Sequence, residues 1–357
     1  MYDVAIVGAG PAGSTLARLI GDKYRVLLLD KRPLVTSTQS TTFAKCCGGL
    51  LAPDAQKMLS KLGLGLPKSV LLGPQLFVVR AIDIQQRLEK YYQRYYINVD
   101  RGRFDDWLRS MVPESVDIKL GWRFKSYEKE NDHFKMEFIH NNRLCFEKAR
   151  ILVGADGASS TIRKQALPRR AFPRSYFAIQ EWVEADSQMP YFSTLFDREI
   201  TDHYCWTIPK GNYLVIGAAL RPKEAAYDKF TLFKKKLKDW GFRFGKTTRR
   251  EGAFILQPMR IKQLSTGTKG IALLGEAAGW ISPSSAEGIS YAFRSALILA
   301  HVLRKALDNF EDHYYRKTKK LRRNIFLKGL KSHFIFNPYL RKMVMRSGLN
   351  SMDISRL

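Results

Sequence analysis

The stretch Val4-Ala5-Ile6-Val7-Gly8-Ala9-Gly10-Pro11-Ala12-Gly13 decides the fold of this 357-residue chain. A short apolar run ends at Gly8, and residues 14–20 continue with helical spacing. Gly8 allows a tight turn, Gly10 lets a pyrophosphate approach the backbone, and Gly13 lets the helix lie close to the strand. The pattern predicts a strand, a glycine turn and a helix.

A second apolar strand, residues 24–29, follows this helix and ends at Asp30. Asp30 comes roughly 20 residues after the glycine turn, where an acid accepts hydrogen bonds from a ribose. The N-terminus of the helix would offer N–H groups to phosphates. The basic Lys31 and Arg32 could also meet phosphate, with solvated side chains as the alternative. We therefore predict a dinucleotide-binding unit, with an ordinary βαβ turn as the alternative.

The length of 357 residues leaves room for two domains or one large elaborated one, and a hydrophobic content of 45% is ample for a core. No apolar run approaches the roughly 18 residues of a membrane span, and the first strand begins too early to leave room for a signal peptide. Four cysteines are too few and too scattered for a disulfide framework or a zinc site. We expect a cytoplasmic protein, or one peripheral on the cytoplasmic face of a membrane.

The charge is strongly positive, with 60 Lys+Arg against 33 Asp+Glu and a net charge of +27. Residues 301–357 hold 14 Lys/Arg and 4 Asp/Glu. One interpretation is attachment to anionic lipid, and the other is a helical cap with a solvated face; nucleic-acid binding is disfavoured because no recognised motif accompanies the charge. The apolar contacts of such an attachment would be Phe326, Leu327, Leu330, Phe334, Ile335 and Phe336.

Two later stretches repeat the logic of the opening, a buried strand that ends in small residues and an acid. The first runs through Gly154 and Asp156-Gly157 to a helix, and the second through Gly275-Glu276 and Gly279 to a helix over residues 290–304. Such acids lie at the carboxyl edge of an open α/β sheet, where ligands bind.

The sequence also predicts a second, mainly antiparallel sheet, formed by segments that lie between these turns. Strands are expected over 75–83, 91–99, 177–184, 191–196, 204–209, 213–220 and 252–258, with helices over 53–62, from residue 100, over 227–240, 313–323 and 326–346. Arg101, at the start of one helix, would point back toward the nucleotide.

Cys46-Cys47-Gly48-Gly49 marks a place where backbone approaches something bulky, or simply a turn before the next helix. Lys45 is a candidate for the same site, with a solvated side chain as the alternative. The six histidines show no metal or triad spacing, so we expect surface or capping residues and no metal site; they are His133, His140, His203, His301, His313 and His333.

The three turns together resemble the flavoprotein monooxygenase superfamily, the p-hydroxybenzoate hydroxylase-like proteins, over roughly residues 1–305. The resemblance implies a FAD cofactor and a Rossmann-like FAD-binding domain, although the family usually has Asp where this chain has Glu276. The residues that it assigns to FAD are Gly8, Gly10, Pro11, Ala12, Gly13, Asp30, Lys31, Arg101, Asp156, Gly157, Ser160, Arg163, Gly275, Glu276, Gly279, Pro283, Gly288 and Ile289.

Within the superfamily, the geranylgeranyl reductase branch is most similar. Cys47-Gly48-Gly49 resembles a motif of that branch, and Tyr204-Cys205-Trp206-Thr207-Ile208-Pro209 resembles its Tyr-x-Trp-x-Phe-Pro stretch. The resemblance implies a role for Cys47 and Gly48 beside the flavin, with Cys47, Tyr204 and Trp206 as catalytic candidates. For Tyr204 and Trp206, packing between strands is the alternative.

The function expected from this resemblance is a FAD-dependent oxidoreductase that passes hydride from reduced flavin to an apolar acceptor such as a prenyl lipid. The electron donor would be NAD(P)H or a redox protein. One alternative is a flavin monooxygenase acting on an aromatic or polyprenyl substrate. The other is a non-enzymatic module that binds a lipid or a prenylated protein.

The expected fold is α/β, or α+β overall, with an interleaved substrate domain and a C-terminal helical segment. We assign residues 1–74, 100–170 and 266–305 to the FAD-binding domain. Residues 75–99 and 171–265 form the substrate domain, and 306–357 the basic C-terminal helices.

Overall fold

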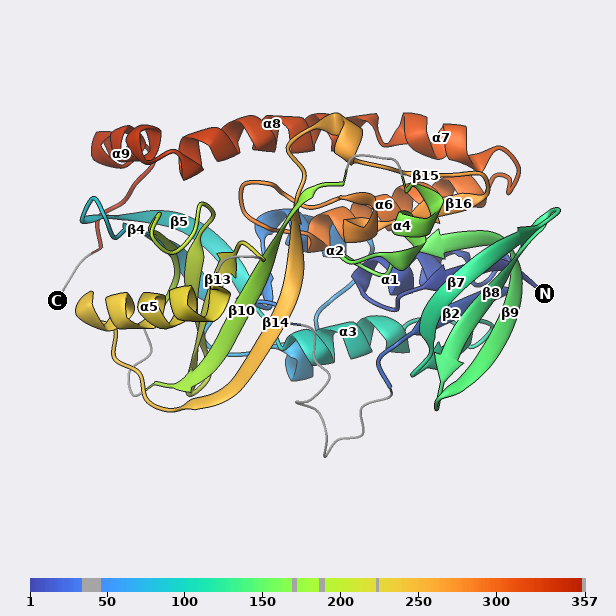
Figure 1. Cartoon of the computed structure of the whole chain (residues 1–357), viewed down its shortest axis with the longest axis horizontal. Coiled ribbons are helices and arrows are strands. Elements are labelled where there is room, and N and C mark those ends of the chain that lie inside the picture. Colours follow the sequence, from blue (N-terminus) through green and yellow to red (C-terminus); the bar gives the residue numbers. More distant parts are fainter. Residues whose placement is uncertain (34–45, 169–171, 186–189, 223–224, 355–357) are drawn as a thin grey trace. The chain divides into compact units, whose positions relative to one another are not determined.

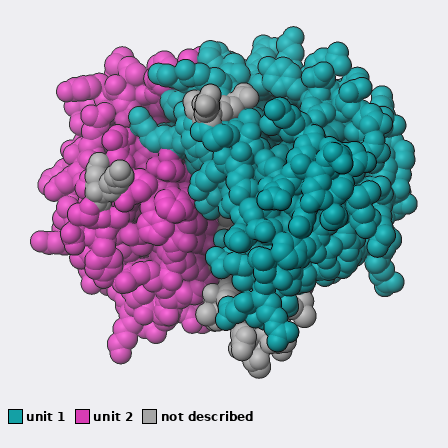
Figure 2. All heavy atoms as spheres, turned by 45° about the vertical axis from the view of Figure 1, so that its right-hand side comes forward, with its two compact units in different colours: residues 1–44, 102–174, 256–329 teal, residues 45–101, 175–255, 330–357 magenta. Residues whose placement is uncertain are grey.

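The computed structural model describes residues 1–33, 46–168, 172–185, 190–222 and 225–354 (Figure 1). The chain forms two compact units, each built from three separate segments (Figure 2). Unit 1 comprises Met1–Ala44, Gly102–Arg174 and Leu256–Gly329, and unit 2 comprises Lys45–Arg101, Ser175–Ile255 and Leu330–Leu357.

Unit 1 is built on a sheet whose central strands are parallel. Its path is β15 (Gly267–Thr268), β16 (Ile271–Leu273), β9 (Arg143–Gly154), β1 (Tyr2–Val7), β2 (Val26–Asp30) and β6 (Asp117–Leu120). All neighbours from β16 to β6 are parallel. Strand β8 (His133–His140) pairs antiparallel with β9, and β7 (Arg123–Glu130) pairs antiparallel with β8.

Helices bury the central strands of unit 1. Every residue of β2 is buried, as expected for a parallel strand covered on both faces. On one face, apolar residues of α1 (Pro11–Ile20) and α6 (Ile289–Leu303) pack in one cluster with β1 and β2. The other helices of this part of the sequence are α3 (Arg101–Ser110), α4 (Thr161–Ala166), η2 (Ile261–Gln263), η3 (Gly275–Ala278) and α7 (Phe310–Lys317).

Unit 2 is built on a second sheet, with mainly antiparallel neighbours. Its order is β14 (Thr247–Gln257), β10 (Arg174–Glu184), β13 (Tyr213–Leu220), β12 (Cys205–Lys210), β11 (Tyr191–Phe196), β4 (Leu76–Asp83), β5 (Leu88–Asn98) and β3 (Leu50–Leu51). Among the strand pairs of this sheet whose register is described, only β11 and β4 run parallel to each other. Helices α2 (Pro53–Lys61), η1 (Lys68–Val70), α5 (Ala226–Asp239) and α9 (Pro338–Ser347) complete the unit.

Two apolar clusters form the core of unit 2. Phe230, Phe233 and Leu237 of α5 pack with strand residues in one of them. The other gathers aromatic side chains, among them Tyr176, Tyr204 and Trp206, with Phe336 packed against it. This aromatic cluster contains two of the residues that the sequence singled out.

The mixed α/β fold class is confirmed, with a Rossmann-type sheet, a second antiparallel sheet and a C-terminal helical segment. The boundary between the two units falls within the C-terminal helical segment, between Gly329 and Leu330. In the described part of the chain, no helix is long and apolar enough to cross a membrane.

The expected helix over 326–346 is two helices, because α8 (Lys319–Phe336) ends before Asn337 and α9 begins at Pro338. Asn337 caps α9, and its Oδ1 accepts hydrogen bonds from the N–H groups of Tyr339 at 3.0 Å and Leu340 at 3.2 Å. Pro338 occupies the first helical position, where its missing N–H costs nothing.

Candidate functional site

The three predicted turns come together at one edge of the sheet of unit 1. Val7 is paired in register with Gly154, and Gly154 with Leu273. The N–H of Ala155 donates to the carbonyl of Val7 at 2.8 Å, and the N–H of Leu274 donates to the carbonyl of Gly154 at 2.9 Å. Because these parallel strands end side by side, their turns form one continuous rim.

The first turn needs its glycines. A Cβ on Gly8, whose φ is +110°, would lie 2.4 Å from the carbonyl oxygen of Ala155, and a Cβ on Gly13 would lie 1.9 Å from the carbonyl oxygen of Gly8. Around Gly10, by contrast, no heavy atom lies within 4 Å of where a Cβ would be. Among the described residues, no side chain caps α1, so its first N–H groups are available to a phosphate.

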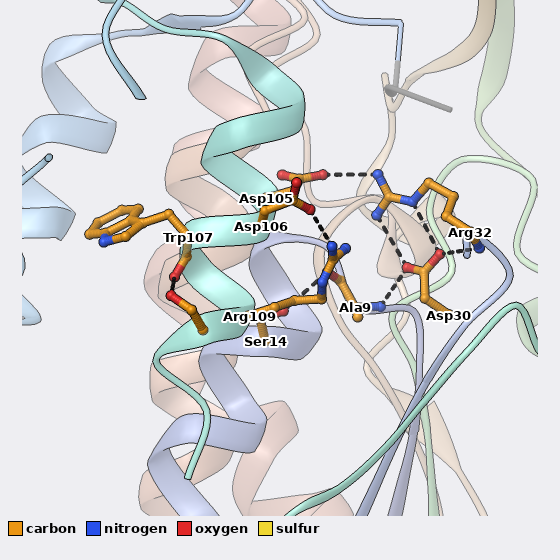
Figure 3. A network of polar contacts seen from close by, with 9 residues as sticks. Ala9, Ser14, Asp30, Arg32, Asp105, Asp106, Trp107 and Arg109 are labelled. Atoms are coloured by element: carbon orange, nitrogen blue, oxygen red, sulfur yellow. Dashed lines mark hydrogen bonds and ion pairs between the residues drawn. The ribbon is translucent and has the colours of Figure 1, made fainter. Parts of the chain in front are cut away.

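Asp30 is at the centre of a polar network beside this turn (Figure 3). Its Oδ2 accepts the N–H of Ala9 at 2.8 Å, and its Oδ1 accepts the N–H and the Nε of Arg32 at 2.8 Å and 3.1 Å. Arg32 also pairs with Asp105, Nη1 to Oδ2 at 3.1 Å. Burial acts to raise the pKa of Asp30, but the charge and hydrogen bonds of Arg32 hold it below its usual value.

The sequence analysis offered Arg32 only as a possible phosphate contact beside Lys31, and did not predict its pairing with Asp30 and Asp105. A basic residue after a strand looks like an ordinary solvated side chain, and its partner Asp105 is far away in the sequence. Ala9 and Arg32 donate hydrogen bonds to the two carboxylate oxygens of Asp30. A ribose hydroxyl that donates to Asp30 would therefore bind an oxygen that already accepts a hydrogen bond from the protein. Lys31 is exposed.

The second turn is organised by Asp156, whose carboxylate binds the first N–H groups of α4. Its Oδ2 accepts the N–H of Thr161 at 2.8 Å and that of Ile162 at 3.4 Å, and burial raises the pKa of this carboxyl. Ser160 caps the same helix through its Oγ, which accepts the N–H of Arg163 at 3.0 Å. Gly157 has a φ of +80° and open space where a Cβ would point.

Arg163 joins the second turn to the third. It is 1% exposed, and its Nη1 donates to the carbonyl of Ala277 at 3.1 Å while its Nη2 donates to the carbonyl of Gln263. A Cβ on Gly279, whose φ is +84°, would lie 3.3 Å from Nη1. The guanidinium thus holds the backbone of the third turn in place.

Glu276, the acid of the third turn, is held in place through its carboxylate. Its Oε1 accepts the N–H of Leu256 at 2.9 Å, which shows how the longer side chain is accommodated where the family usually has Asp. Next to it, Gly275 has a φ of +51°, and its N–H donates to the Oγ of Ser295 at 3.1 Å.

The loop after the third turn leads into α6. The carbonyl of Pro283 accepts Nε2 of Gln257 at 3.1 Å. Gly288 stands at the N-terminus of α6 without a capping side chain of its own, and Glu287 accepts both the N–H and the Oγ of Ser290 at 2.7 Å. Ile289, the first residue of the helix, is buried.

Unit 2 holds the second group of predicted residues around the Cys47-Gly48-Gly49 segment. A Cβ on Gly48 would lie 2.5 Å from Cδ1 of Ile208, and a Cβ on Gly49, whose φ is +60°, would lie 2.3 Å from the carbonyl oxygen of Val99. The carbonyl of Cys47 accepts Nε2 of Gln180 at 3.4 Å. The segment therefore packs closely on strand β12.

A buried lysine holds this segment. Lys210 is 3% exposed, and its Nζ donates to the carbonyls of Val99 at 2.8 Å and Gly49 at 3.2 Å. Burial lowers its pKa to about 7, opposed in part by Cys47 and Asp100. The sequence analysis missed Lys210, and its only signal was a lysine directly after the Tyr-x-Trp-x-x-Pro stretch.

Tyr204 and Trp206 lie in the aromatic cluster of unit 2, with their ring centroids 5.8 Å apart. Trp206 packs on Gly217, where a Cβ would lie 2.2 Å from the indole. Burial raises the pKa of Tyr204, with smaller contributions from Tyr96 and Cys47, so its hydroxyl stays protonated at neutral pH. Both side chains are buried, as packing between strands would also require.

The prediction that all six histidines are surface or capping residues is wrong for His203. Its side chain is 3% exposed, and its ring centroid lies 4.8 Å from those of Tyr176 and Tyr204 and 4.6 Å from that of Phe336. Burial lowers its pKa to about 3, so the imidazole is neutral and serves as one more ring of the aromatic cluster. Its sequence neighbours did not reveal that the site is apolar.

The predicted site residues thus fall into two groups. The glycines and acids of the three turns, with Ser160, Arg163 and Pro283, lie in unit 1, while Cys47, Gly48, Tyr204 and Trp206 lie in unit 2. Arg101 is buried and is the first residue of α3. Lys45 lies outside the described residues. Within the described ranges, no three His, Cys, Asp or Glu side chains gather as a metal site requires.

The chain is similar in sequence to proteins named CbrA from enteric bacteria. It is 42% identical to the protein of Escherichia coli O9:H4 (strain HS) over 348 residues, which cover 98% of this chain and 94% of that protein. The corresponding protein of Shigella sonnei (strain Ss046) is also 42% identical, over 98% of this chain and 97% of its own. No model of a known protein family matches the chain.

Solved structures share the fold at low sequence identity. A geranylgeranyl bacteriochlorophyll reductase-like protein from Thermoplasma acidophilum has a TM-score of 0.79 at 19% identity, over 96% of this chain and 90% of its own. PqsL of Pseudomonas aeruginosa, a probable FAD-dependent monooxygenase, has a TM-score of 0.67 at 18% identity, over 98% and 99%. The flavin-dependent halogenase CmlS has a TM-score of 0.72 at 14% identity, over 99% and 68%. The chain therefore shares the fold of these three proteins.

Proposed function

This chain belongs to the family of proteins named CbrA, and we propose that it is a FAD-dependent oxidoreductase that passes hydride to an apolar acceptor. The reaction that we favour is the reduction of a double bond in a prenyl lipid. Electrons would come from NAD(P)H or a redox protein.

The observation that carries the proposal is the rim formed by the three turns of unit 1. Its first turn excludes side chains at Gly8 and Gly13 yet leaves the space at Gly10 open, in front of a helix N-terminus with no capping side chain. Backbone N–H groups at such a terminus bind the pyrophosphate of a dinucleotide. The residues present therefore fit the ADP half of FAD.

Each part of the rim has a role in this proposal. Asp30 and Arg32 orient the adenosine end. Asp156 and Ser160 hold the second turn, Arg163 fixes the third, and Glu276 lies where the superfamily binds the ribityl chain. Bound FAD would supply the hydride chemistry, while the protein supplies binding, orientation and exclusion of water.

We assign contact with the hydride acceptor to Cys47, Tyr204 and Trp206. Saturating a carbon–carbon double bond requires a hydride at one carbon and a proton at the other. The protonated hydroxyl of Tyr204 or the thiol of Cys47 would give that proton and recover it from water. Apolar neighbours of Tyr204, such as Trp206 and Ile208, suit a hydrocarbon chain.

The reductase assignment is supported by the Cys47-Gly48-Gly49 and Tyr204 to Pro209 motifs and by the fold shared with a reductase-like protein. A second candidate is a flavin monooxygenase, because the same fold occurs in PqsL and in flavin-dependent halogenases. The rim of unit 1 would serve either reaction.

The test is anaerobic turnover of the chemically reduced protein with a geranylgeranyl lipid, followed by mass spectrometry of the lipid. A reductase adds two hydrogens per turnover without oxygen, whereas product that contains an added oxygen, formed only in air, would replace the proposal by the monooxygenase. Tyr204→Phe should slow lipid reduction while leaving the flavin content unchanged, and Cys47→Ser should also slow lipid reduction. A matched control is Tyr213→Phe, a partly exposed tyrosine of β13 in the same sheet.

A further inference from the structure

We propose that helices α8 and α9 carry a docking surface for an anionic lipid membrane. We name it the basic-apolar face. It consists of the exposed side chains Lys319, Lys320, Arg323, Phe326, Leu327, Leu330, Phe334, Tyr339, Met343, Val344, Arg346 and Leu349. This proposal stands on surface chemistry and is independent of the reaction proposed above.

The exposed apolar side chains of α8 follow helical spacing. Phe326, Leu330 and Phe334 are 48%, 50% and 54% exposed and lie four residues apart, so they form a stripe along one side of the helix. Leu321 and Ile325 are buried. The helix therefore buries one apolar side and presents another to solvent.

Helix α9 continues the pattern from a firmly held position. Its Arg341 is 6% exposed, and its Nε pairs with Oδ2 of the fully buried Asp83 at 2.8 Å. The Nη1 of Arg341 also donates to the carbonyl of Ile335 at 2.8 Å. With this side anchored, Tyr339 and Met343 are 80% and 68% exposed.

The concentration of such residues is what requires an explanation. Single exposed apolar side chains are normal on a protein surface, but grouped ones mark interaction sites. Nine large apolar side chains that are exposed fall within residues 326–352: Phe326, Leu327, Leu330, Phe334, Tyr339, Met343, Val344, Leu349 and Met352.

The charge of the same segment identifies the partner. Residues 313–352 contain eleven Lys/Arg and no Asp/Glu. Of the eleven, Arg341 is neutralised by Asp83; the excess of the others makes the segment attract an anionic surface and repel a cationic one. Large apolar side chains among the basic ones suit the boundary between lipid headgroups and acyl chains. A nucleic acid backbone would use the charge but leave the apolar stripe unpaired. Neither helix is long and apolar enough to cross the bilayer, which leaves a helix pair lying on its surface.

The test is flotation of the full-length protein with vesicles of phosphatidylcholine alone or mixed with phosphatidylglycerol. The protein should float with the mixed vesicles and remain behind with phosphatidylcholine. Lys319→Gln/Lys320→Gln/Arg323→Gln should weaken partitioning by roughly a hundredfold, since each basic residue near an anionic surface contributes a several-fold factor. Leu330→Ser/Phe334→Ser/Met343→Ser should reduce it similarly by removing the apolar contacts.

Two control variants change exposed residues elsewhere by the same chemistry. They are Lys57→Gln/Lys61→Gln/Lys235→Gln and Phe77→Ser/Leu144→Ser/Phe146→Ser, and both should float like the unchanged protein. Equal recovery with and without phosphatidylglycerol would overturn the proposal, as would equal loss in test and control variants. Retention of a labelled DNA duplex by the unchanged protein in place of flotation would assign the face to nucleic acid instead. Because the readout is partitioning, none of these outcomes depends on whether the protein reduces a lipid.

Discussion

Asp30 in unit 1 and Lys210 in unit 2 are both buried charged groups beside a glycine whose Cβ has no room, Gly8 and Gly49. Their partners differ. Asp30 meets a guanidinium that holds its pKa down, whereas Lys210 donates to two backbone carbonyls and its pKa falls to about 7. Asp30 therefore stays charged at neutral pH and fixes structure, while Lys210 titrates where an enzyme works.

The largest expected effect comes from filling the space beside Lys210. Gly49→Ala should lower the free energy of unfolding by roughly 4 kcal/mol, because it combines a left-handed backbone with overpacking against Val99 and Lys210. Gly211→Ala is the matched control, since Gly211 has a φ of +59° against +60° at Gly49 but no heavy atom within 4 Å. It should cost about 1–2 kcal/mol. If urea unfolding shows that the two variants lose equal free energy of unfolding, then Lys210 and Val99 do not exclude a side chain at position 49.

Removing the partner of Asp30 should have the next largest effect. Arg32→Met leaves the carboxylates of Asp30 and Asp105 without their guanidinium, and we expect a loss of roughly 3 kcal/mol at pH 7. The exposed neighbour supplies the control, because Lys31→Met should change stability by less than about 0.5 kcal/mol.

This loss should depend on pH with a defined sign. The lowered pKa of Asp30 contributes stability that is present above the unfolded-state pKa of an aspartate, about 3.9, and is lost as the pH falls through the folded-state value. The difference between the unchanged protein and Arg32→Met should therefore shrink on acidification below about pH 4. A difference that stays constant down to acid-induced unfolding would contradict the assignment.

The smallest effect at pH 7 is expected for Lys210→Met, since an apolar side chain of similar length replaces a buried charge. Its effect should appear on raising the pH. Between about 7 and the ordinary value of 10.5 the unfolded chain binds more protons at this lysine than the folded one, so its contribution to stability rises with pH. The unchanged protein should gain stability over this window relative to Lys210→Met. Parallel pH profiles in urea unfolding would show that Lys210 is not neutralised by burial.

Much of unit 1 could be predicted because its signals are local. Each turn carries its glycines and acid within about ten residues, and parallel strands then bring the three turns to one edge. The ion pairs of Arg32 and the buried position of Lys210 could not be predicted, because what distinguishes each from a solvated basic residue is a partner supplied by a remote segment, Asp105 or Val99. His203 was misjudged for the same reason, since Tyr176 and Phe336 make its surroundings apolar.

The central claim is that the rim of unit 1 holds a flavin that reduces a lipid, and an absorbance spectrum of the purified protein tests it most directly. The account predicts a flavin band that bleaches on anaerobic reduction and returns when a geranylgeranyl lipid is added without oxygen. A protein with no flavin band after incubation with FAD would contradict it and would point to a module that only binds its ligand.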